Sequence, residues 1–183
     1  MIVSVCCPGP SLRLFHDDKK SLVVSVNRAV ELVDRTDYWL FIDKNATERI
    51  TPDPTKVWRA VSRREPLGCA LERWPWLAGR TLVLPMPRDH KGFMEKFGVG
   101  LMRYAANYST GAAIAFAFDT LNATEVNVYG HDMAGLADAD GFVWEENTRV
   151  RSDARWTKER GLWQKAVDDL NKNSPQLRLQ RIL

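Results

Sequence analysis

The stretch Ile2-Val3-Ser4-Val5-Cys6-Cys7-Pro8-Gly9-Pro10-Ser11 joins a short apolar run to an abrupt stop. Isoleucine and valine favour extended backbone, and proline ends a strand because it has no N–H to donate. The run therefore predicts a buried strand followed by a tight turn. Further apolar runs of similar length occur at 22–26, 38–42, 56–61, 81–84 and 125–129, and a closing strand is expected at 176–183.

Segments with helical spacing separate these runs. Residues 27–33 predict a helix with Asn27 as its N-cap. The stretch 111–121 (GAAIAFAFDTL) is apolar nearly all round and predicts a buried helix, and 155–170 predicts a charged amphipathic one. This alternation predicts an α/β, Rossmann-like fold, a mostly parallel sheet with helices on both faces. Residues 66–79 are expected to be irregular, and 133–153 to form a long loop or lid.

Composition narrows the class of protein. A length of 183 residues predicts a single domain, 1–183. The apolar fraction of 45% and charged fraction of 27% are typical of a globular protein and exclude a disordered one. No apolar run approaches the roughly 20 residues that span a bilayer, and the N-terminus lacks the basic region of a signal peptide. Three cysteines, two of them adjacent, favour a reducing compartment, so a cytoplasmic location is expected.

The carboxyl ends of the predicted strands carry the candidate binding residues. In parallel sheets, ligands bind beyond these ends. The candidates there are Gly9, Pro10, Ser11, Asn27, Asp43, Gly130, His131 and Asp132. Gly9 would let backbone approach a ligand and Ser11 would offer its hydroxyl and N–H to phosphate, although a plain tight turn is the alternative. The turn matches neither a Walker A loop nor G-x-G-x-x-G, which disfavours common ATPases and NAD(P) dehydrogenases.

Two further groups of residues could act on a phosphorylated ligand. Ser109, Thr110 and Gly111 open the apolar helix, where free N–H groups attract an anion or where a serine simply caps the helix. Arg149, Arg151 and Arg155 form either a phosphate clamp or a solvated face. A net charge of +3 is too small to require a nucleic-acid partner.

His131 and Asp132 are the best acid/base candidates, because a carboxylate can fix the tautomer of an imidazole or raise its pKa. Adjacent residues of a strand point to opposite faces, however, so direct pairing does not follow from the sequence. A metal site is not predicted, since Asp138-Ala139-Asp140-Gly141 lacks the spacing of a calcium loop.

Seven tryptophans stand out in the composition. Trp39 and Trp58 fall in predicted strands and are expected in the core. Trp156 and Trp163 lie seven residues apart and so share one helix face, where packing is again expected. Tryptophans in predicted loops could stack on a base or sugar, or could plug small cores. These are Trp74, Trp76 and Trp144.

Several short motifs follow one another in a fixed order. They are Gly9-Pro10-Ser11-Leu12, Val26-Asn27, Ser109-Thr110-Gly111-Ala112, Ala123-Thr124-Glu125-Val126 and Gly130-His131-Asp132. In this order they resemble the bacterial sialyltransferase-like glycosyltransferases of the family-42 type. They are also similar to the motility-associated-factor and pterin-diphosphokinase-like group, and small phage proteins share the pattern. The likeness runs from residue 1 to about 132.

The resemblance implies a nucleotide-binding transferase. In that family the corresponding positions hold a cytidine nucleotide sugar, and here they are Gly9, Pro10, Ser11, Asn27, Ser109, Thr110 and Gly111. Pro8 stands where the family usually has a nucleotide-contacting asparagine. The family's general-base histidine at the start of the last helix is missing, because Arg155-Trp156 occupy that region, with Glu159 keeping an acidic position. His131 replaces a residue that is usually apolar.

Three hypotheses follow. The first is a nucleotide-sugar-dependent glycosyltransferase without a metal, in which His131 or Asp132 activates the acceptor hydroxyl. The second is a diphosphokinase or nucleotidyl enzyme that uses ATP and a divalent metal held by Asp43 and Asp132. The third is a nucleotide-binding protein without catalysis. The sequence fixes neither donor nor acceptor, and the acceptor would be held by the 133–153 loop or by a partner subunit of a homo-oligomer.

Overall fold

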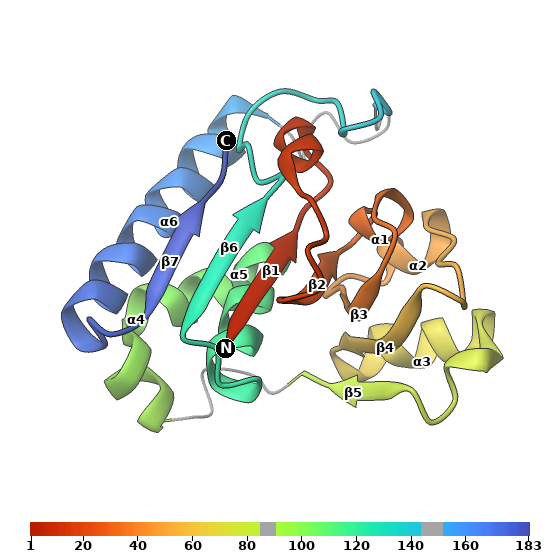
Figure 1. Cartoon of the computed structure of the whole chain (residues 1–183), viewed down its shortest axis with the longest axis horizontal. Coiled ribbons are helices and arrows are strands. Elements are labelled where there is room, and N and C mark those ends of the chain that lie inside the picture. Colours follow the sequence, from red (N-terminus) through yellow and green to blue (C-terminus); the bar gives the residue numbers. More distant parts are fainter. Residues whose placement is uncertain (85–90, 144–151) are drawn as a thin grey trace.

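Seven parallel strands form the centre of the chain, in a computed structural model that describes residues 1–84, 91–143 and 152–183 (Figure 1). The strand order is β5-β4-β3-β2-β1-β6-β7, and every neighbouring pair is parallel. The predicted α/β, Rossmann-like fold is thereby confirmed. The strands are β1 (Ile2–Cys6), β2 (Leu22–Val26), β3 (Thr36–Leu40), β4 (Val57–Ser62), β5 (Thr81–Val83), β6 (Glu125–Tyr129) and β7 (Arg178–Arg181).

Helices cover both faces of this sheet, because successive strand residues point to opposite sides. Leu40 packs in the larger core with the long helices, whereas its neighbour Trp39 packs in a second core on the other side. The first face holds α4 (Lys91–Asn107), α5 (Ser109–Ala115) and α6 (Asp153–Asn173). The second holds α1 (Ala29–Leu32) and α3 (Arg64–Arg73), with α2 (Asn45–Arg49) between them in the chain.

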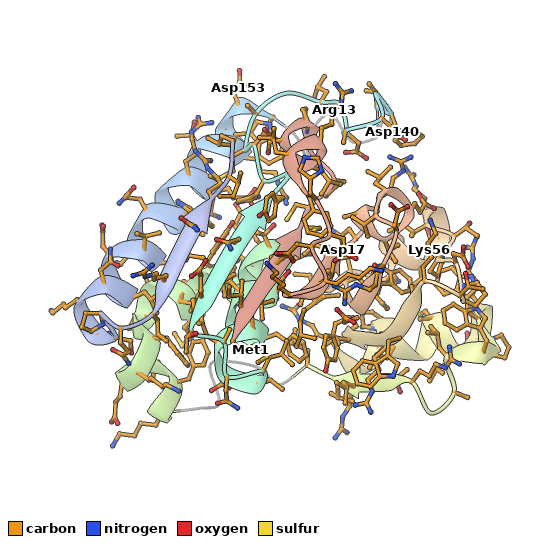
Figure 2. All side chains as sticks on the ribbon, in the orientation of Figure 1. Met1, Arg13, Asp17, Lys56, Asp140 and Asp153 are labelled. Atoms are coloured by element: carbon orange, nitrogen blue, oxygen red, sulfur yellow. The ribbon has the colours of Figure 1, made fainter. Side chains whose placement is uncertain are left out.

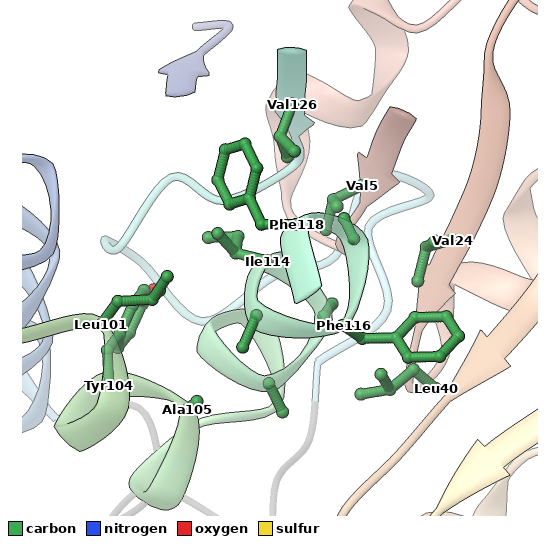
Figure 3. Packing of buried hydrophobic residues seen from close by; sticks show 14 of the residues in the cluster. Val5, Val24, Leu40, Leu101, Tyr104, Ala105, Ile114, Phe116, Phe118 and Val126 are labelled. Atoms are coloured by element: carbon green, nitrogen blue, oxygen red, sulfur yellow. The ribbon is translucent and has the colours of Figure 1, made fainter. Parts of the chain in front are cut away.

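The predicted apolar helix lies at the centre of the larger core. It begins two residues earlier than expected, as α5, and continues into a π-helical turn, η4 (Phe116–Thr120). Ile114 and Phe118 pack among the valines of the central strands (Figure 3). Gly111 lets this helix approach α4 closely, because a Cβ there would lie 2.5 Å from the carbonyl carbon of Tyr104. Gly111 therefore serves helix packing.

Some sequence-based expectations were wrong. Residues 66–79, expected to be irregular, contain most of α3 and the short helix η2 (Pro75–Leu77). Leu67 and Ala70 lie one turn apart on α3, and together with Leu77 of η2 they fill the second core. The helix α4 was not predicted. Asn27 is not an N-cap but adopts a left-handed φ of 50°, and α1 begins after Arg28.

The tryptophans also divide differently from the prediction. Trp39 is fully buried, as expected, but Trp58 is 52% exposed, with its ring 5.6 Å from that of Tyr38. Trp74 and Trp76 are partly buried against the second core, which is the second of the two roles expected for them. Trp144 lies outside the described residues.

The first half of the predicted loop, 133–143, is fastened to the rest of the fold. Arg28 binds Asp138 and Asp140 at 3.1 and 2.6 Å, and Ala139 donates its N–H to the Pro8 carbonyl at 2.7 Å. Arg13, in the short helix η1 (Pro10–Leu14), donates to the Ala139 carbonyl at 2.7 Å. Figure 2 shows Arg13 and Asp140 at the end of the molecule toward which β1 and β6 point. The helices in the described ranges include none with the length and apolarity to cross a membrane.

Candidate functional site

A pocket of about 380 Å³ lies at the carboxyl ends of β1, β2 and β6, the edge at which the sequence predicts a ligand. Its walls come from segments more than 100 residues apart, which the sheet order brings together because β1 pairs with both β2 and β6. This volume lies within the usual range for a small-molecule site. Nine of the predicted residues line it: Gly9, Asn27, Asp43, Ser109, Thr110, Gly130, His131, Asp132 and Arg155.

Of the other five predicted residues, Arg149 and Arg151 lie outside the described residues. Pro10, Ser11 and Gly111 do not line the pocket. Pro10 is exposed at the start of η1, and Gly111 packs against α4. Ser11 is buried, its Oγ accepts the Gly130 N–H at 3.0 Å, and its own N–H donates to Oδ2 of Asp132 at 3.1 Å. The N–H that was expected to hold a phosphate therefore already has a protein acceptor.

Two glycines allow the loops after β1 and β6 to touch. Gly130 has a φ of +66°, and a Cβ there would lie 1.9 Å from the carbonyl oxygen of Cys7. Gly9 donates its N–H to the Gly130 carbonyl at 2.9 Å, and a Cβ on Gly9 would lie 2.5 Å from Oδ2 of Asp132. The floor of the pocket is thus formed by the backbones of the two loops at Gly9 and Gly130, which lie so close together that neither residue has room for a side chain.

His131 is the centre of a buried polar network. Its Nε2 lies 2.5 Å from the Tyr104 hydroxyl and its Nδ1 lies 3.4 Å from Oγ1 of Thr110. Thr110 in turn lies 3.4 Å from the Cys7 thiol. Burial lowers the pKa of His131 to about 3, and the charge of Arg181 acts in the same direction. The imidazole is therefore neutral at neutral pH, with both nitrogens engaged.

Glu159 closes this network from helix α6. Only 3% of the residue is exposed, and Oε1 accepts the Tyr104 hydroxyl at 3.4 Å and lies 3.7 Å from Nε2 of His131. Burial raises the pKa of Glu159 to about 7, against the opposing effects of Arg155 and of the Tyr104 hydrogen bond. Arg155 Nε lies 3.9 Å from Oε2, too far for a hydrogen bond.

Tyr104 and Glu159 are site residues that the sequence reasoning did not select. Tyr104 could not be placed because its helix was not predicted. Glu159 did carry a signal, since residues 159, 163, 166 and 170 recur at helical spacing, and Ala166 and Leu170 are buried with it. A carboxylate on the apolar stripe of an amphipathic helix indicates a buried acid, which requires a partner or a function.

Three polar atoms of pocket-lining residues lack hydrogen-bond partners among the described residues. They are Oδ1 of Asn27, Nε of Arg155 and Oε2 of Glu159, and all three are shielded from solvent. Buried polar groups are normally paired, so the two acceptors favour a ligand that brings a donor, and the Arg155 N–H favours one that brings an acceptor. Asp43 and Asp132 both line the pocket, but within 1–84, 91–143 and 152–183 no three His, Cys, Asp or Glu side chains gather as a metal site would require.

The fold of the chain is similar to that of solved sialyltransferases. The whole chain aligns with 81% of the sialyltransferase CstII from Campylobacter jejuni in complex with a substrate analogue, CMP-3FNeuAc, with a TM-score of 0.57 and 12% identity. It aligns equally with sialyltransferase CST-II in complex with trisaccharide acceptor and CMP, with a TM-score of 0.58 and 12% identity. No family model and no curated protein matches the sequence. At this identity the likeness establishes the fold, and the motility-factor and pterin-kinase part of the resemblance stays a prediction.

Proposed function

We propose that the chain is a glycosyltransferase that binds a nucleotide sugar in the strand-end pocket. The observation that carries the proposal is the convergence of nine sequence-predicted residues, from six separate segments, on one cavity. The fold likeness supports the same class, because the similar structures are sialyltransferases bound to CMP or to a CMP-sugar analogue.

The roles follow from the chemistry of the walls. The glycine floor, with Asn27, Ser109 and Thr110, holds the nucleotide, and the orphan Oδ1 of Asn27 accepts a hydroxyl or amino group of it. Arg155 is the one described member of the predicted phosphate clamp. Its guanidinium offsets the charge that develops on the leaving nucleotide. Asp132 and His131 stay proposed site residues, with His131 buried, neutral and in contact with the Tyr104 hydroxyl.

Nucleotide binding tests the proposal directly. Thermal shift and titration calorimetry would compare CMP, UMP, GMP and ATP with magnesium. A ligand at 100 times its Kd stabilises the native state by about 2.7 kcal/mol, which raises the Tm of a chain of this size by roughly 5–10 °C. We expect this shift with a cytidine or uridine nucleotide. A shift only with ATP and magnesium would favour the diphosphokinase hypothesis, and no shift at all would refute nucleotide binding.

Two pairs of variants localise the binding. Arg155→Gln should weaken it about tenfold, as the loss of one charge-assisted contact does, whereas Lys158→Gln, exposed on the same helix, should not. Asn27→Gly keeps the left-handed backbone but removes the amide. Its control is Asn122→Gly, an exposed position outside the pocket with a φ of 55°. Release of CMP from CMP-N-acetylneuraminic acid, or of UMP or UDP from UDP-sugars, then distinguishes a transferase from a binding protein.

A further inference from the structure

Oε2 of Glu159 is an unpaired acceptor in the wall of the pocket. Among the described residues no donor lies within hydrogen-bond distance of it, although the carboxylate is almost fully buried. Oε1, by contrast, is held by the Tyr104 hydroxyl at 3.4 Å. One oxygen is therefore fixed by the protein and the other is available to a molecule in the pocket.

The groups that face this carboxylate are one cation and several side chains that are uncharged at neutral pH. Arg155, one turn earlier on α6, is the cation beside it. The other segments contribute Tyr104 from α4, Tyr108 from between α4 and α5, His131 from the loop after β6 and Cys7 from directly after β1. His131 stays uncharged, and burial raises the pKa of the Cys7 thiol to about 12, so neither adds charge at neutral pH. Burial outweighs the effect of Arg155 and raises the pKa of Glu159 to about 7, so this carboxylate can take up and release a proton near neutral pH, as a general base must.

When Glu159 is ionised, one direction of donation satisfies every contact in the network. The Thr110 hydroxyl donates to Nδ1 of His131, and the protonated Nε2 donates to the Tyr104 hydroxyl. Tyr104 then donates to Oε1 of Glu159. With this neutral tautomer, His131 has no free lone pair for an acceptor hydroxyl. It acts through Tyr104 on the orientation of Glu159 and is a positioning residue.

We propose that Glu159 is the catalytic base of the chain, with Oε2 accepting the proton of the acceptor hydroxyl. The inference rests on the proposed transferase function. The acceptor O–H bond breaks and its proton moves to Oε2. The acceptor oxygen bonds to the anomeric carbon, and the bond from that carbon to the phosphate oxygen breaks with its electron pair left on the nucleotide. Glu159 then returns the proton to solvent.

The test compares Glu159→Gln with Asp168→Asn, an exposed carboxylate on the same helix. Glu159→Gln should bind CMP within about threefold of the wild-type Kd but lose 10²–10⁴-fold in kcat, the usual range for a general base. The rise of kcat through pH 7 should disappear with it. Glu159→Asp should recover part of the rate. His131→Gln should shift the pH limb without abolishing it, and Asp168→Asn should change nothing.

The outcomes separate the two proposals. Wild-type protein that binds none of the nucleotides refutes the proposed function, and with it the role of Glu159. Binding without release of nucleotide from any nucleotide sugar refutes both catalytic proposals and leaves a binding protein. Turnover in Glu159→Gln within threefold of wild type, with an unchanged pH limb, refutes the role of Glu159 alone.

Discussion

The Tyr104 hydroxyl lies 2.5 Å from Nε2 of His131, and it joins helix α4 to the loop after β6 inside the protein. Both residues are buried, with exposed fractions of 0% for Tyr104 and 5% for His131. Removing one partner of such a pair costs more stability than replacing both by apolar groups, because a single removal leaves the other group without a hydrogen bond. The contact should therefore show strong energetic coupling.

Tyr104→Phe should lower the free energy of unfolding by about 1–3 kcal/mol, the cost of leaving Nε2 of His131 without its partner. In the double variant Tyr104→Phe/His131→Leu this penalty disappears, so a double-mutant cycle by urea denaturation should give a coupling of about 1–2 kcal/mol. Tyr129→Phe is the control, since its hydroxyl has no described hydrogen bond, and it should cost less than about 0.5 kcal/mol. A cycle that closes within 0.5 kcal/mol would contradict the contact.

The opposite pKa shifts of His131 and Glu159 predict an unusual dependence of stability on pH. The folded state holds the pKa of His131 at about 3, below its ordinary 6.5, so this residue makes stability rise with pH between those values. The folded state holds the pKa of Glu159 at about 7, above its ordinary 4.5, so Glu159 makes stability fall as the pH rises from 4.5 to about 7. Between about pH 4.5 and 6.5 the two slopes cancel.

Removing one partner should reveal the slope of the other. In Glu159→Gln the free energy of unfolding should rise with pH from 4.5 to 6.5, by up to about 1.4 kcal/mol per pH unit relative to wild type. In His131→Leu it should fall with pH over the same window. Urea titrations at four pH values, with Asp168→Asn as the reference, measure these slopes. Parallel curves for wild type and both variants would show that neither group has the shifted pKa.

Gly130 has a left-handed backbone and also lies close to the backbone of Cys7. The cost of backbone strain and the cost of the steric clash in a Gly130 variant can be measured separately. Gly130→Ala would place a Cβ 1.9 Å from the Cys7 carbonyl oxygen, and we expect a loss above about 4 kcal/mol or no folded protein. Gly135 has a similar φ of +70° with open space around it, so Gly135→Ala should cost only the strain, about 1–2 kcal/mol. Expression yield and urea midpoints compare them. Equal losses would mean that backbone strain alone fixes Gly130.

The sequence predicted the sheet because its strands are short, β-branched runs with clear stops. It predicted the edge of the site for the same reason, since a parallel sheet places all the carboxyl ends together. It did not predict α4, because glycines at 92, 98 and 100 interrupt its pattern, and Gly98 indeed adopts a φ of 88° there. Because Tyr104 lies on that helix, it was not predicted as a site residue either.

The hydrogen-bond partners inside the site could not be predicted from local sequence patterns, because they are far apart in the chain. His131 looks like a general base from its place at a strand end, but the α4 and α5 side chains that fill both its hydrogen bonds are 27 and 21 residues away. Asp132 lies beside His131 in the sequence, yet it bonds the N–H of Ser11. Only the packed structure decides which of the neighbouring acids faces the imidazole, and this acid is Glu159.

Arg28 attaches the 133–143 segment to the rim of the pocket. Its guanidinium binds Asp138, whose side chain is fully buried, and forms two hydrogen bonds with Asp140, while it lies 4.4 Å from the centre of the Phe142 ring. The next residue to Arg28 in the chain is Asn27 of the pocket wall. Release of this arginine should therefore loosen the segment without disturbing the sheet.

Limited digestion with chymotrypsin, read as cleavage after Phe142, measures that loosening. Arg28→Met should speed this cleavage about 5–30-fold, because the lost charge-assisted contacts are worth about 1–2 kcal/mol of local opening. Arg103→Met, at an exposed position on α4, should leave the rate within twofold. The urea midpoints of both variants should stay close to wild type. Cleavage of Arg28→Met at the wild-type rate would show that the contacts from Pro8 and Arg13 are sufficient to hold the segment.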